Sequence, residues 1–211
     1  MSTLQSTNLK HEASVTNNIV LDASGNTSVS GNATVSGNAV ITGTLQANGV
    51  TGSVYPLVQG AAQASTSGTS IDFTGIPSWV KRITIMFNGV STGGTSIKQI
   101  QLGDSGGFET TGYLGSGVQL TDATSVNAAT ITTGFGIRSA LAADTINGAV
   151  VITNFTGNTW VAQGALTDSS RGAGYLVGGA KALSDVLTQV RITTVNGTDA
   201  FDAGSINILY E

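Results

Sequence analysis

Residues 23–52 read ASGNTS, VSGNAT, VSGNAV, ITGTLQ, ANGVTG, and this stretch repeats one six-residue pattern five times. Each block begins with an apolar residue and carries glycine two positions later. A period of six matches neither the helical turn nor a heptad, and Gly, Ser, Thr and Asn are poor in helix interiors. The pattern therefore predicts short stacked strands joined by corners, as in a β-solenoid. The apolar positions are Ala23, Val29, Val35, Ile41 and Ala47, and the glycines are Gly25, Gly31, Gly37, Gly43 and Gly49.

The number of blocks indicates how many chains build the solenoid. One chain would need about three blocks for each triangular coil, so five blocks give fewer than two coils. Three identical chains, each supplying one side, would instead form a closed prism with Val29, Val35 and Ile41 along its axis. The sequence therefore predicts a homotrimeric β-stem over residues 23–54. The alternative is an unstructured Gly/Ser/Thr/Asn linker, which the composition alone would allow.

Composition excludes several classes of partner and cofactor. Charged residues make up 9% of the 211 residues, against about a quarter in typical soluble proteins, so we expect much of the surface to face partners. The net charge is −4, and the eight Lys and Arg residues form no basic run, which argues against nucleic acid and anionic membranes. There is no cysteine and no apolar run of membrane-spanning length. We expect no cofactor, no metal, no membrane insertion, and assembly in a cytoplasm.

The residues before and after the repeat differ from it in composition. Residues 1–22 hold the only histidine, His11, and a short apolar run, Ile19–Leu21, that reads as a strand. This segment is predicted either to dock onto a larger partner or to pack against the chain's own stem. Tyr55-Pro56 ends the repeat, because proline removes a ladder donor and biases the preceding residue toward an extended conformation. Residues 55–69 are predicted to be a linker.

From residue 70 to 211, strand signals recur with turn signals between them. Residues 80–87 alternate cleanly, with Ile83, Ile85 and Phe87 on one side, and end at an Asn-Gly turn. Residues 130–137 alternate in the same way and are predicted to form one strand. Eight or nine such strands predict an all-β head domain, an antiparallel β-sandwich of jelly-roll type. Trp79 and Trp160 are predicted to anchor its core.

Two constellations resemble catalytic sites. Gly103–Gly107 spells GDSGG, as in trypsin-like serine proteases, but that chemistry needs a histidine beside the serine. The only histidine lies in residues 1–22, outside the predicted head, so we expect no protease and assign no catalytic residue. Asp104, Glu109 and Asp122 fall in one region, and a converging pair would suit glycoside hydrolysis. A polysaccharide-degrading activity therefore stays open.

Several phrases resemble the distal domain of fibre and spike-like proteins of tailed bacteriophages. They are SIDFTGIPSWVKRITIMFNGV at 70–90, QLGDSGG at 101–107, TGY at 111–113 and NGTDAFDAGSINILYE at 196–211. NLKH at 8–11 and NNIVLD at 17–22 are similar to segments near the N-termini of phage structural proteins. The resemblance implies a homotrimer whose residues 1–22 attach to another virion protein. The anchoring residues would be Leu9, Lys10, His11, Ile19 and Leu21.

The resemblance also implies a function. We expect a non-enzymatic virion fibre whose tip attaches to polysaccharide or protein on the host surface, with three tips multiplying a weak affinity. The predicted tip loops are 103–117 and 169–179, with Ser105, Tyr113, Arg171 and Tyr175 as surface residues. The stem is shorter than in long tail fibres, so a fibre that decorates the capsid is an alternative. A free lectin or adhesin would need an export route.

Overall fold

The computed structural model describes residues 55–121, 125–142 and 144–211, together with 8–9, 13, 19–21, 23–24, 26–29, 36, 45–47 and 50–52. The chain divides into two compact units, Met1–Val54 and Tyr55–Glu211. Strands, turns and bends make up the described residues, and no helix occurs among them. The sheets are antiparallel throughout the described pairings. The predicted all-β class is confirmed.

Within Met1–Val54 the described strands form two small sheets. One sheet has the order β1-β2-β3, and in it Ile19 lies opposite Val29. The other is a hairpin of β4 and β5. The bounds are β1 Asn8–Leu9, β2 Ile19–Leu21, β3 Thr27–Val29, β4 Leu45–Ala47 and β5 Val50–Gly52.

The predicted stem and anchor fall only partly on described residues. Val35, Ile41, Lys10 and His11 lie outside them, so the predictions for these side chains stay untested. Val29 is described, and it is 43% exposed within its own chain. A single chain therefore gives this aliphatic side chain little cover. Leu9, Ile19 and Leu21 belong to the β1-β2-β3 sheet, and the stem itself remains a prediction.

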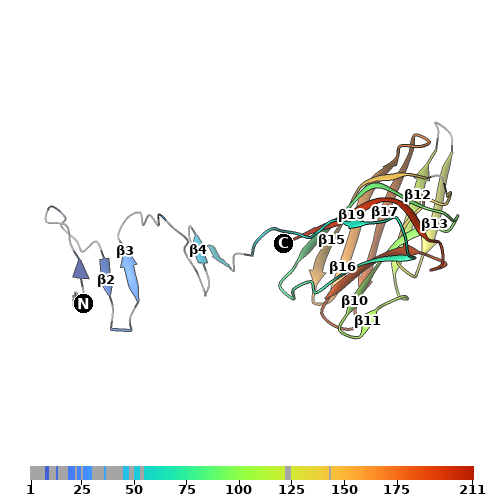
Figure 1. Ribbon diagram of the computed structural model, residues 1–211. Coiled ribbons are helices and arrows are strands. Elements are labelled where there is room, and N and C mark those ends of the chain that lie inside the picture. The colour runs from blue at the N-terminus through green and yellow to red at the C-terminus, as the bar shows by residue number, and fades with distance from the viewer. Residues whose placement is uncertain are drawn as a thin grey trace. The chain divides into compact units, whose positions relative to one another are not determined.

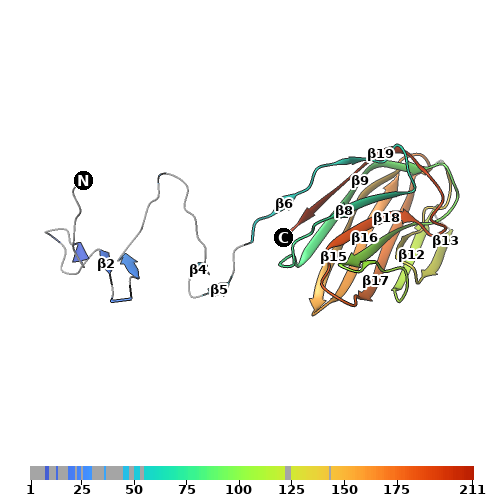
Figure 2. The same ribbon diagram turned by 60° about the horizontal axis from the view of Figure 1, so that its bottom comes forward.

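The unit Tyr55–Glu211 contains two antiparallel sheets that lie face to face (Figures 1 and 2). The large sheet has nine strands in the order β13-β12-β17-β16-β15-β9-β19-β6, with β7 also paired to β19. Its strands are β6 Val58–Gln59, β7 Gln63–Ala64, β9 Arg82–Thr92, β12 Leu114–Leu120, β13 Val126–Ile131, β15 Ile146–Thr156, β16 Thr159–Asp168, β17 Ala173–Ala182 and β19 Phe201–Tyr210.

The small sheet has five strands in the order β11-β10-β18-β8, with β14 also paired to β10, on the same edge as β11. The chain crosses between the two sheets repeatedly, so strands that are neighbours in space come from distant parts of the sequence. The small-sheet strands are β8 Ser70–Thr74, β10 Lys98–Asp104, β11 Gly107–Phe108, β14 Phe135–Ile137 and β18 Gln189–Thr194.

Alternating apolar residues from both sheets form one hydrophobic core. Ile83, Ile85 and Phe87 of β9 are buried, as their alternation predicted. Ile100 of β10 and Ile192 of β18 meet them from the small sheet. Burial of a large aliphatic side chain contributes roughly 1.5–3 kcal/mol, so the core is the main source of stability. Trp160 is buried in this core, whereas Trp79 is partly buried and packs against it.

The segment 130–137 differs from its prediction as one strand. β13 ends at Ile131 in the large sheet, and β14 begins at Phe135 in the small sheet. Between them the chain passes close over β10. A Cβ on Gly134 would lie 2.9 Å from the carbonyl oxygen of Ile100. The apolar alternation continued across this crossover, so periodicity alone could not separate the two strands.

Two short strands, β6 and β7, lie within the predicted linker 55–69 and belong to the large sheet. β6 and β7 pair with β19, Leu209 lying opposite Gln59 and Ile206 opposite Gln63. At the same end the Tyr55 ring stacks on Trp79, with 4.9 Å between ring centroids, and Tyr210 lies 6.0 Å from Trp79. The first and last residues of this unit are therefore held together by one aromatic cluster.

Candidate functional site

A polar cleft of about 370 Å³ opens on the outer side of the small sheet. Its lining comes from β8, β10 and β18 and from the loops at residues 110, 133 and 195–197. The lining side chains are almost all hydroxyls and amides, with one guanidinium. They are Thr69, Ser70, Gln99, Gln101, Thr110, Thr133, Arg191, Thr193, Thr194, Val195 and Asn196, together with Gly197.

Arg191 is the cationic group of this polar cleft, and its position is fixed by two contacts. It lies directly opposite Asp72 in the pairing of β18 with β8. Its Nε and Nη2 donate to the two carboxylate oxygens of Asp72 at 2.8 and 2.7 Å, and its Cζ lies 4.1 Å from the centre of the Phe108 ring. The hydrogen bonds that Arg191 donates to Asp72 raise the pKa of Arg191. A bidentate pair stacked on an aromatic ring holds the guanidinium plane rigid.

Two glutamines of β10 form the opposite wall. Gln99 Oε1 accepts from Thr133 Oγ1 at 2.7 Å, and Gln99 Nε2 donates to the carbonyl of Thr194 at 3.3 Å. Gln101 Nε2 donates to the carbonyl of Thr133 at 2.9 Å. Both glutamines point outward because Ile100 and Leu102, which alternate with them, are buried in the core. The wall is therefore pre-organised by the strand and by the loop that crosses it.

This lining suits a ligand rich in hydroxyl groups. Fixed amides, hydroxyls and a guanidinium edge supply both donors and acceptors, as a sugar ring requires. No carboxylate, histidine or cysteine belongs to the lining of this cleft in the described part of the chain. The described lining therefore offers no nucleophile paired with a base.

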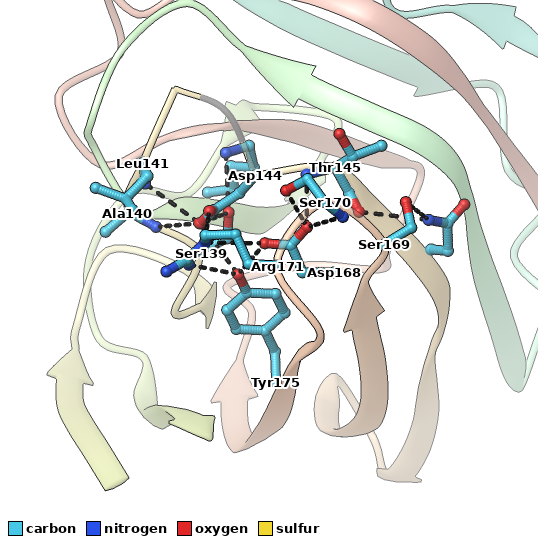
Figure 3. A network of polar contacts seen from close by, with 12 residues as sticks. Ser139, Ala140, Leu141, Asp144, Thr145, Asp168, Ser169, Ser170, Arg171 and Tyr175 are labelled. Atoms are coloured by element: carbon cyan, nitrogen blue, oxygen red, sulfur yellow. Dashed lines mark hydrogen bonds and ion pairs between the residues drawn. The ribbon is translucent and has the colours of Figure 1, made fainter. Parts of the chain in front are cut away.

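A buried network of charges lies near the ends of β16 and β17 (Figure 3). Asp144 accepts from Arg171 Nε at 2.7 Å and from Tyr175 Oη at 3.0 Å. Asp168 accepts from the same Arg171 Nε at 3.3 Å and from the same Tyr175 Oη at 3.2 Å. Lys98 extends the network, since its Nζ donates to Ser139, which donates to Asp144. Each carboxylate thus meets a cation and several donors.

The pKa values in this network follow from burial and hydrogen bonding. Burial acts to raise the pKa of Asp168, but hydrogen bonds from Ser170 and Thr145 outweigh it and lower the pKa to about 2. Burial and the charge of Asp144 raise the pKa of Tyr175 to about 12. Burial lowers the pKa of Lys98, and Asp144 partly offsets that effect. The network therefore holds charged groups that stabilise one another, the arrangement expected of a structural anchor.

The four residues predicted for the tip surface divide into two pairs. Ser105 is exposed and donates to Asp185 at 3.5 Å, and the side chain of Arg171 is 30% exposed above the network. Tyr113 and Tyr175 are each 1% exposed, so their predicted place on the surface is wrong. Tyr113 Oη bonds the backbone of Leu102, and Tyr175 Oη bonds two carboxylates. Buried tyrosines keep their hydroxyls paired in this way.

The acidic residues considered for glycoside hydrolysis do converge in part. Ser184 Oγ donates to Asp104 at 2.7 Å and to Glu109 at 2.9 Å, while Asp122 lies outside the described residues. Hydrogen bonds, first of all from Ser184, lower the pKa of Asp104. Burial raises the pKa of Glu109, but Lys181 and Ser184 outweigh it and the pKa is lowered. A general acid needs a raised pKa, so this pair does not favour hydrolysis.

Sequence reasoning missed the polar cleft, although part of its signal was present. The alternation of Gln99, Ile100, Gln101 and Leu102 indicates that the two glutamines face away from the core. That they lie beside Arg191 could not be predicted from the sequence. Arg191 is on β18, which pairs with β10 although it follows about ninety residues later in the chain.

Comparison with known proteins gives no match, neither to a family model nor to a curated protein or solved structure. The described residues contain no helix long and apolar enough to span a membrane. They also contain no group of three or more His, Cys, Asp or Glu side chains arranged to hold a metal ion. The described residues define an all-β protein whose unit Tyr55–Glu211 has two antiparallel sheets over one core.

Proposed function

We propose that this protein is a short homotrimeric fibre of a tailed-phage virion, attached through residues 1–22 and presenting the unit Tyr55–Glu211 to the host surface. The observation that carries the proposal is the combination of a six-residue repeat with a two-sheet head that bears a pre-formed polar cleft. Further copies of the chain would close a repeat that is too short to close on itself, and a pre-formed polar cleft can hold a polar ligand.

The strand order supports a jelly-roll interpretation of the head. In a jelly roll of eight strands the chain pairs strand one with eight, two with seven, three with six and four with five. With β6 and β7 counted as strand one, those pairs are β6/β7 with β19, β8 with β18, β9 with β15 and β10 with β14. Two inserted hairpin elements, β12-β13 and β16-β17, then widen the large sheet. The proposed architecture is a jelly roll with two insertions.

The chemistry of the polar cleft supports attachment to a glycan. The ligand class we propose is a polysaccharide on the host surface, bound through its hydroxyl groups by Gln101, Thr193 and the guanidinium of Arg191. Three clefts on one trimer raise the effective affinity without any new contact, so each cleft need bind only weakly. Location on the virion follows from the resemblance of the head and N-terminal phrases to phage fibre proteins, and attachment to the capsid rather than the tail remains the rival placement.

The test combines localisation with binding. Cryo-electron microscopy of assembled particles is expected to show threefold density for this chain on the tail, whereas threefold density on the capsid would favour decoration. The purified full chain is then applied to an array of bacterial surface polysaccharides, with Arg191→Leu as the cleft variant and Arg82→Leu as the control at an exposed arginine. Retention of wild type and R82L with loss of R191L is expected. Failure of every polysaccharide to bind wild type would overturn the glycan assignment.

A further inference from the structure

The side of the large sheet that faces away from the core carries no charged side chain across five consecutive strands. These are β13, β12, β17, β16 and β15, all of whose residues the structure describes. The only charged residues in the five strands are Asp168 and Lys181, and both are buried. Sheets that face water normally alternate apolar with polar and charged residues. We name this surface the uncharged face.

Large aliphatic side chains gather on the uncharged face and stand exposed. In the strand register Leu120 lies opposite Val126, and Val118 lies opposite Leu176. These neighbours form one continuous patch, because directly opposed residues share the same side of a sheet. Leu114, also on this side, is 78% exposed, and Leu176 near the middle is 46% exposed. A contiguous exposed apolar patch on a folded domain marks an interaction surface.

The uncharged face also contains a hollow that matches its projections. A depression of about 460 Å³ lies over β15, β16 and β17, where Ala149, Gly164 and Ala165 are too small to fill the space. Leu114 and Val126 project from the neighbouring strands β12 and β13. Rotational symmetry brings different parts of one surface together on adjacent copies. A surface with both a hollow and projections can therefore complement a second copy of itself.

The area of the uncharged face is sufficient for a stable contact. Five strands spaced about 4.8 Å apart, each with about eight residues at 3.3 Å, span roughly 24 by 26 Å, or about 600 Å². Two such faces packed against each other would bury about 1,200 Å² in total, the lower limit for a specific interface, whereas three faces around one axis would bury about 1,800 Å² over the whole trimer.

We infer that the uncharged face is the contact surface between the heads of identical copies of this chain. The outer side of the small sheet carries the Asp72–Arg191 pair and the polar cleft. An uncharged surface packed on it would bury these polar groups without offering them partners, so the small sheet does not complement the uncharged face. The uncharged face of another copy is, by identity, equally apolar and equally large. The inference rests on the proposed function only for the number of copies, because the proposed fibre is a trimer.

The chain contains no cysteine, so the labelling rate of a single introduced thiol reports the accessibility of that one position. The full-length variants are Leu176→Cys on the uncharged face and Val186→Cys in the loop before β18. These two side chains are matched, at 46% and 41% exposed. A maleimide carrying polyethylene glycol is the probe. Because labelling of a covered thiol requires opening of the contact, we expect L176C to react at least about tenfold more slowly than V186C. After denaturation the two should react alike.

Native mass spectrometry of the same samples separates this inference from the proposed trimer. Trimeric mass with slow labelling of L176C supports both. Trimeric mass with equal labelling of the two variants overturns the contact surface and leaves the trimer intact. A dimer with slow labelling supports the contact surface and contradicts the threefold fibre, whereas a monomer overturns both.

Discussion

The two outer surfaces of the head use opposite chemistry although they cover the same core. The outer side of the small sheet holds the paired charges Asp72 and Arg191 beside amides and hydroxyls. The uncharged face of the large sheet holds exposed Leu, Val and Ala side chains, and the charges of its strands point inward. Paired charges thus lie on one side, whereas the other side carries exposed aliphatic side chains among uncharged polar ones such as Gln163 and Thr167. We propose that the polar side serves recognition and the uncharged face serves assembly.

The largest expected effect comes from adding a charge to the uncharged face. Leu176→Lys would place an ammonium group where a second copy covers the sheet. An unpaired charge in a buried contact costs about 3 kcal/mol or more, and about 1.4 kcal/mol corresponds to tenfold, so association should weaken by more than about 100-fold. Sedimentation of a dilution series measures it. Val186→Lys is the control, and equal masses for both variants at every concentration would contradict the assignment.

The next largest effect concerns the charges beneath the large sheet. Asp168→Asn leaves Arg171 with one carboxylate fewer in a buried network, and losses of about 3 kcal/mol in the free energy of unfolding are typical of such changes. Asp185→Asn, at an exposed carboxylate, is the control. Urea unfolding at pH 7 gives both values, and a loss of the same size in the control would show that burial of the network does not matter.

The same aspartate predicts a dependence on pH. The pKa of Asp168 is lowered from its ordinary value of 3.8 to about 2 in the folded chain. Its contribution is therefore complete above about pH 4 and is lost as the pH falls toward 2, because the unfolded chain binds the proton first. Wild type should lose stability across this window, and D168N should show a shallower slope. Parallel slopes for the two proteins would rule out this aspartate as the cause.

A smaller effect is expected on the polar side. The Asp72–Arg191 pair is about one-third exposed, so solvent screens it and its coupling should be about 0.5–1 kcal/mol. A double-mutant cycle with Asp72→Ala and Arg191→Leu, measured by urea unfolding, isolates that coupling. The mass of the assembly should stay unchanged in all three variants. Dissociation on removal of Asp72 would mean that the polar side also contacts another copy.

The smallest effect is the response of assembly to salt. A contact without charges should change its association constant by less than about twofold between 0.05 and 0.5 M sodium chloride, because screening acts on charges. Sedimentation at the two concentrations measures it in wild type. A tenfold weakening in high salt would indicate that charged groups contribute to the contact after all.

Much of the head was predictable because its core strands alternate. Ile83, Ile85 and Phe87 were assigned to the core from period-two spacing, and they are buried. Tyr175 was assigned to the surface because glycines surround it, yet its register with Leu166 turns it inward. β17 reads AGYLVGGAKA and lacks polar residues on its outward side. Because the outward positions of β17 are not polar, its sequence does not alternate between polar and apolar residues. The inward direction of Tyr175 could therefore not be predicted from the pattern.

The polar cleft and the buried network were not predictable for another reason. Arg191 pairs with Asp72, which lies more than a hundred residues earlier in the chain. Asp144 lies in a loop and Asp168 at a strand end, and both accept a hydrogen bond from Tyr175. Such meetings depend on which strands become neighbours, a property of the whole topology rather than of any local pattern. The residue types were visible in the sequence, but their convergence was not.

The aromatic cluster of Tyr55, Trp79 and Tyr210 makes the head a transferable module. Because its first and last strands end at one place, the head could replace a surface loop in an unrelated protein without a spanning linker. The closeness of these two ends thus keeps the core and both outer surfaces of the head together whenever the unit is moved.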